Sequence, residues 1–117
     1  MATERETVLE TGGGDVAVRE AVQRDRLLGL WAEIQPFAEP FSPEASVAVA
    51  PLTNAQRLML SRWRTLFDSE IRLVRGARNE VVHSPSNLAG ETLSGAVDVA
   101  SQLREILFGG LQNPVVV

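Results

Sequence analysis

The sequence predicts an all-α protein, a small antiparallel helical bundle with three long helices and a short fourth helix left open. Two observations favour this class. Apolar residues recur every three or four positions in three separate segments of the 117-residue chain. Prolines and glycines fall mainly between those segments, where helices end and turns form. The length and the 44% hydrophobic content suit one domain with a small core.

The first helix is expected over residues 15–36. Residues 1–14 are polar and end in three glycines, which predicts a flexible leader. Asp15 is placed to cap the helix that follows, and three prolines close it: Pro36, Pro40 and Pro43. Residues 40–52 fit either a short helical turn or an extended connection.

The central helix is expected to run from residue 53 to residue 83. The segment Thr53-Asn54-Ala55-Gln56 matches a capping box, in which the first and fourth residues cap each other's backbone amides. No proline follows until Pro85, so the helix is predicted to be about 45 Å long at 1.5 Å per residue. Gly76 is its expected weak point. The buried face is marked by Leu60, Trp63, Phe67, Ile71, Val74 and Val81.

The last helix carries apolar residues in an alternating spacing of four and three, which is typical of a seam that packs on another helix. Gly109-Gly110 is expected to end it as a C-cap. The predicted organisation is therefore a leader (1–14), one bundle domain (15–110) and an apolar tail (111–117). The seam consists of Ala89, Leu93, Ala96, Ala100, Leu103 and Leu107.

The central helix has more apolar surface than two neighbouring helices can cover. Apolar residues outside the predicted buried face include Leu58, Met59, Leu66 and Leu73. Exposed surface of this kind usually marks an interaction site. We therefore expect a homodimer built chiefly on residues 53–83.

Composition limits the chemistry. The chain has no cysteine and one histidine, so we expect neither a metal site nor a cofactor. No segment has the length and hydropathy to cross a bilayer and the N-terminus does not resemble a signal peptide, so we expect a cytoplasmic protein without membrane contact. The net charge is −4, but residues 53–83 carry six arginines against three acids, which favours binding of a phosphate-bearing partner there.

The candidate site is the segment Arg78-Asn79-Glu80-Val81-Val82-His83 at the end of the central helix. Histidine is the side chain that exchanges protons near neutral pH, and His83 is the chain's only one. Helical spacing places Arg72, Arg75, Asn79 and His83 on one polar stripe, with Arg78 beside it. An arginine to offset charge on a phosphorane, an asparagine to orient groups and a histidine to move a proton fit phosphate chemistry.

This segment resembles the signature of the HEPN family of all-helical domains, an arginine followed by a histidine a few positions later, with asparagine among the residues favoured after the arginine. The resemblance covers roughly residues 53–108. It implies a four-helix bundle that dimerises and brings two motifs into one cleft, and it implies metal-independent cleavage of RNA through the ribose 2′-hydroxyl. Arg78 and His83 would be catalytic and Asn79 supportive, with Arg72 and Arg75 holding substrate. Such domains are common in toxin–antitoxin and antiviral systems.

Two other interpretations remain open. The first is a noncatalytic helical module that binds a protein partner, such as an antitoxin, or a nucleotide; the surplus apolar face motivates it. The second is purely structural, because a histidine and an arginine in the last turn of a helix interact favourably with its terminal carbonyls. The position of His83 distinguishes the catalytic interpretation from the other two, since a catalytic histidine should open into a cleft.

Overall fold

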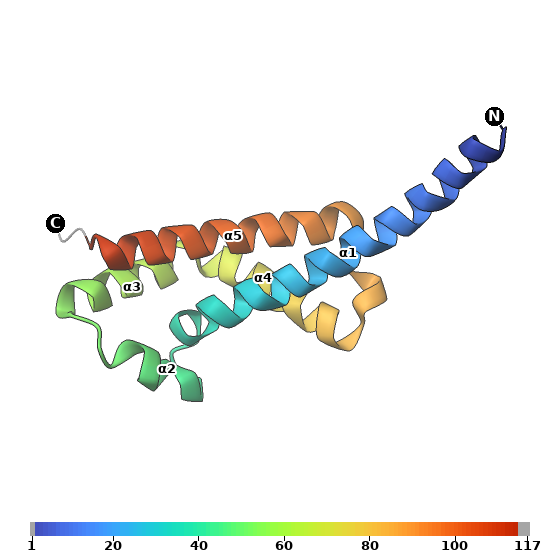
Figure 1. Ribbon diagram of the computed structural model, residues 1–117. Helices are drawn as coiled ribbons and strands as arrows, with labels where there is room; N and C mark the ends of the chain where they lie inside the picture. Colours follow the sequence, from blue (N-terminus) through green and yellow to red (C-terminus); the bar gives the residue numbers. More distant parts are fainter. Residues whose placement is uncertain (1, 115–117) are drawn as a thin grey trace.

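A computed structural model of the chain is all-α, which confirms the predicted helical bundle (Figure 1). It describes the backbone of residues 2–114 and the side chains of residues 15–114 other than Ser86; residues 115–117 of the predicted tail lie outside this range. The elements are α1 (Ala2–Ala38), α2 (Pro43–Val49), α3 (Asn54–Leu66), α4 (Asp68–His83), the 3-10 turn η1 (Pro85–Asn87) and α5 (Gly90–Gln112).

The bundle core forms where α1, α4 and α5 meet and where α3 packs on α5. Figure 1 shows α3 and α4 running in the opposite direction to α1 and α5. Trp63, predicted on the buried face, is buried, and so is Trp31 of α1. Among the described residues, no helix combines the length and hydropathy that a bilayer span needs. The core includes Leu27, Trp31, Ile34, Leu60, Trp63, Val74, Leu93, Ala100, Leu103 and Leu107.

The first helix begins earlier than predicted. Its backbone is helical from Ala2, so it passes through the segment expected as a leader and through Gly12, Gly13 and Gly14. No proline precedes Pro36, and residues 2–10 are mostly good helix formers, so nothing in that segment forbids a helix. Figure 1 shows the N-terminal part of α1 extending beyond the bundle.

The undecided segment 40–52 contains a short helix, α2. Pro43 occupies the first turn, where proline is tolerated, and Glu44 lies near the positive end of the helix. Ala45 is buried against the rest of the molecule. Residues 40–52, for which the sequence allowed either a helical turn or an extended connection, therefore contain a short helix.

The predicted long central helix is wrong, because the chain breaks at Phe67 into α3 and α4. Phe67 has φ −112° and ψ 25°, outside the helical region, although its own amide and carbonyl still bond to Trp63 and Ile71. Gly76, the expected weak point, lies inside α4. The break lets α3 pack on α5 while α4 also contacts α1. Sequence periodicity misses it because the buried positions keep helical spacing through Phe67.

The last helix does not end at Gly109-Gly110 as predicted but continues to Gln112. Leu111 is buried and anchors the extra turn, and the Gln56 side-chain amide donates to the Leu111 carbonyl at 2.8 Å. A Cβ at Gly110 would lie 2.6 Å from the Met59 sulfur. Gly110 therefore permits close contact between α5 and α3 instead of capping the helix.

The start of α5 is held by α1. Gly90 has φ +59°, the only positive φ among the described residues, and its amide donates to Glu20 Oε2 at 2.7 Å. Ala89, the N-cap residue, has no side-chain acceptor, so the Glu20 carboxylate takes that role from a distant part of the chain. Arg24 donates to the Leu88 carbonyl at 3.3 Å. These two contacts fix η1 and the first turn of α5 beside α1.

Candidate functional site

The predicted motif lies in the last two turns of α4, on the side away from the core. At 3.6 residues per turn, Arg72, Asn79 and His83 lie roughly opposite the buried face of this helix. All three are exposed. The buried face of α4 consists of Ile71, Val74, Ala77 and Val81.

Within the motif, Arg78 and Asn79 contact each other and His83 lies apart. Arg78 Nη1 donates to Asn79 Oδ1 at 3.2 Å, and Arg78 is half-buried at the edge of the packed face, as its register predicts. The His83 side chain is exposed and forms no hydrogen bond or ion pair with the described residues. The single chain therefore does not assemble the three side chains into a closed site.

Arg72 and Arg75, the predicted substrate-binding residues, both have partners within the chain. Arg72 pairs with Asp68, four residues earlier on the same helix, at 3.1 Å. Arg75 reaches α1, where its guanidinium lies 5.9 Å from the centre of the Trp31 ring and 3.7 Å from Glu39 Oε1. Arg75 thus ties α4 to α1 and is not directed toward His83.

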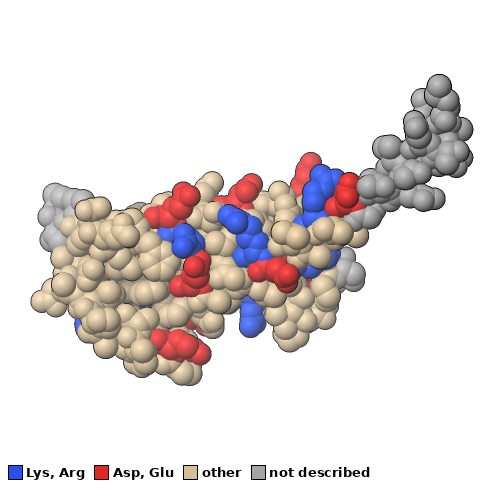
Figure 2. All heavy atoms as spheres, viewed as in Figure 1, with Lys and Arg blue, Asp and Glu red and all other residues tan. Residues whose placement is uncertain are grey.

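Arg64, on α3, donates to the Phe37 carbonyl at 2.5 Å. Burial lowers the pKa of the Arg64 guanidinium. Part of the positive charge in residues 53–83 is therefore used in helix packing. On the face shown in Figure 2, basic and acidic side chains are interleaved. Among the described residues no three His, Asp or Glu side chains gather in a group able to hold a metal ion.

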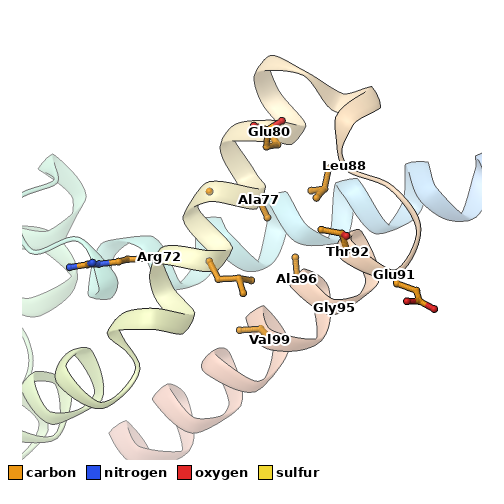
Figure 3. Close-up of a pocket in the computed structure, with 11 residues that line it drawn as sticks. Arg72, Ala77, Glu80, Leu88, Glu91, Thr92, Gly95, Ala96 and Val99 are labelled. Atoms are coloured by element: carbon orange, nitrogen blue, oxygen red, sulfur yellow. The ribbon is translucent and has the colours of Figure 1, made fainter.

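A groove of about 530 Å³ lies elsewhere, between α4 and α5 (Figure 3). Its lining is mostly apolar. Ala77, Leu88 and Ala96 are buried at its floor, and Arg72 and Glu80 lie on its α4 side. Leu73 also lines the groove and is 52% exposed. Neither Arg78, Asn79 nor His83 lines it.

Two glycines line the groove, Gly76 near the middle of α4 and Gly95 in the second turn of α5. A Cβ at either position would meet no atom within 4 Å, so internal packing does not require glycine there. Each glycine costs about 1 kcal/mol relative to alanine inside a helix. Their absent side chains keep the groove open to the backbone of a docked element.

Sequence analysis missed this groove as a site, although two signals pointed to it. Gly76 was interpreted only as a weak point of a helix, and Leu73 only as part of a surplus apolar face. Gly76 and Leu73 form one groove only because of where α5 lies relative to α4, and periodicity does not give that arrangement.

The geometry defines an all-α bundle with an open apolar groove and a separate polar motif at the end of α4. Comparisons of the chain with models of protein families, with curated proteins and with solved structures found no match.

Proposed function

We propose that this protein is a noncatalytic interaction module that binds an amphipathic helix of a protein partner in the groove between α4 and α5. The observation that carries the proposal is the open apolar groove, with a glycine on each of its two helices. Helix-in-groove recognition uses such a surface, because apolar anchor side chains enter the groove while the helix backbone approaches its walls.

Two features of the surroundings support this function. Two further apolar side chains are exposed on the helices that carry or precede the groove, Leu66 at the end of α3 (74%) and Ile106 on α5 (45%). In addition, His83 lies exposed and without a partner among the described residues, as expected of a module whose polar motif is not an active site. Exposed apolar residues that cluster around a concave site typically mark a docking surface.

The groove can be tested with anilinonaphthalene sulfonate, a dye that fluoresces in apolar sites. At submicromolar chain concentration we expect the wild type to bind the dye, and Gly95→Arg to weaken binding by about tenfold because the new side chain fills the groove. Gly29→Arg is the matched control, since Gly29 lies on exposed α1 surface where a Cβ also meets nothing within 4 Å. Equal dye binding by the wild type and both variants would reject the groove as a docking site.

RNA cleavage is a second candidate function, favoured by one observation. Arg78 and Asn79 are joined by a hydrogen bond one turn before an exposed histidine, so an RNA phosphate placed between them could contact all three side chains. His83 would take the proton from a ribose 2′-hydroxyl or protonate the leaving 5′-oxygen, and Arg78 would offset the charge on the phosphorane. Asn79 would hold the Arg78 guanidinium in position.

The cleavage hypothesis predicts a large effect from one side chain. In EDTA, His83→Ala should slow cleavage of single-stranded RNA by at least about a hundredfold, and Arg78→Ala should do the same. Arg26→Ala, which removes an exposed arginine from α1, should leave the rate unchanged. Absence of wild-type cleavage on several RNAs, or equal rates in all four proteins, would contradict this function.

A further inference from the structure

Of the three charged residues that line the groove, Arg72 and Glu80 lie on α4 at equal distances on either side of Gly76, and Glu91 lies in the first turn of α5. Arg72 lies four residues before Gly76 and Glu80 four residues after it, and both line the groove. In Figure 3 these two side chains lie at opposite ends of the α4 wall. A helix that runs antiparallel to α4, with its centre at Gly76, would therefore meet a positive charge at one end and a negative charge at the other.

The α4 helix itself has this complementary pattern. When two copies of α4 pack antiparallel about a two-fold axis at Gly76, Arg72 lies opposite Glu80 of the partner subunit, and the symmetric contact repeats the pair. In a parallel arrangement like charges would face each other, which disfavours that alternative. The charge pattern thus fits a second copy of α4 and favours the antiparallel direction.

We propose that the groove is filled by a second copy of this chain, in a two-fold dimer with α4 antiparallel to α4 of the partner and Gly76 at the axis. This inference rests on the proposed function and names its partner. Leu73 of each chain would enter the other chain's groove near Leu88, so each groove is incomplete without the other copy. The absent side chain at Gly76 lets the two backbones approach at the axis.

The contacts within one chain do not oppose this pairing. Arg72 now pairs with Asp68, but both side chains are mostly exposed, at 73% and 59%, and such surface pairs contribute little. Arg72 can therefore reach the partner's Glu80 at small cost.

This dimer differs from the one expected from the sequence. His83 would lie opposite Ser69 of the partner subunit, and the two copies of His83 would be about 20 Å apart along the helices at 1.5 Å per residue. The resemblance to HEPN domains implies that the two Arg78/His83 motifs share one cleft. In the dimer proposed here they do not, because the axis lies at Gly76. The groove, and not the motif, is the centre of this interface.

Charge reversal tests the pairing. We expect the wild type to sediment as a dimer of the 12.7 kDa chain at micromolar concentration. Arg72→Glu and Glu80→Arg each place like charges at both symmetric contacts and should raise the dimer dissociation constant by at least about tenfold. The double variant restores opposite charges and should return the constant to within about threefold of the wild type.

A cross-link tests the position of the axis. The chain has no cysteine, so Gly76→Cys introduces a single thiol that should form an intersubunit disulfide on mild oxidation. Gly29→Cys, on exposed α1, should stay largely uncross-linked under the same conditions. Both substitutions place the side chain in open space, so both proteins should fold.

Three outcomes would overturn the inference. A wild type that stays monomeric at all concentrations excludes the dimer, yet leaves the proposed function standing if the groove still binds the dye. If neither single charge variant weakens the dimer, its interface lies elsewhere. The same conclusion follows if Gly76→Cys forms no intersubunit disulfide. Failure of the dye to bind a wild type that is monomeric at the concentration used would instead reject the proposed function.

Discussion

Trp63→Ala is expected to lower the free energy of unfolding by about 3–5 kcal/mol, the usual cost of removing a buried aromatic side chain. Trp63 is 2% exposed and lies in the core between α3 and α5. Its indole N–H donates to the Leu103 carbonyl at 3.3 Å. The substitution removes both the packing and this bond at the place where α3 is held to the bundle.

Urea unfolding followed by circular dichroism measures the effect. Trp63→Phe keeps an aromatic ring and loses the hydrogen bond, so it should fall between the wild type and Trp63→Ala. Phe41→Ala is a matched control, because Phe41 is 99% exposed and its loss should change stability by at most about 0.5 kcal/mol. Similar losses for Trp63→Ala and Phe41→Ala would show that Trp63 is not a core anchor.

Helical periodicity predicted the core well because burial follows directly from the spacing of apolar residues. Leu60, Trp63, Ile71 and Val74 were all expected inside and are buried. The capping box at Thr53 also forms, with the Thr53 hydroxyl accepting from the Gln56 amide at 3.1 Å and the Gln56 side chain accepting from Thr53 at 2.9 Å. Both are local properties that a single segment encodes.

Helix ends were predicted less well because tertiary contacts decide them. Phe67 interrupts a pattern that is locally continuous, and the break is useful only once α1 and α5 are in place. Gly110 has the sequence signature of a C-cap, but the burial of Leu111 and the contact with Met59 keep it helical. Propensity is a weak guide when packing favours a different outcome.

The candidate site likewise has one part that the sequence predicts and one part that depends on tertiary contacts. The exposure of Asn79 and His83 follows from their spacing relative to the buried face of α4, and the sequence contained that information. The groove depends on where α5 lies beside α4, and therefore on the distant contacts of Glu20 and Arg24 that hold the start of α5. No local pattern encodes those contacts.

A second large effect is expected from Leu107→Ala, and comparison with Leu73→Ala separates stability from binding. Leu107 is 0% exposed in the core of α5, so its truncation should cost about 2–5 kcal/mol of unfolding free energy. Leu73 is half exposed at the groove, so the same change should cost the dilute protein at most about 1 kcal/mol.

The two leucine variants should also differ in how their stability depends on concentration. A dimer is stabilised by mass action, so the midpoint of thermal unfolding of the wild type should rise with chain concentration. Leu73→Ala should reduce that dependence, because its side chain fills the partner's groove. Leu107→Ala should lower the midpoint at every concentration and keep the dependence. A Leu73→Ala protein with the wild-type dependence would mean that Leu73 is outside the interface, since losing a buried leucine from an interface must weaken the association.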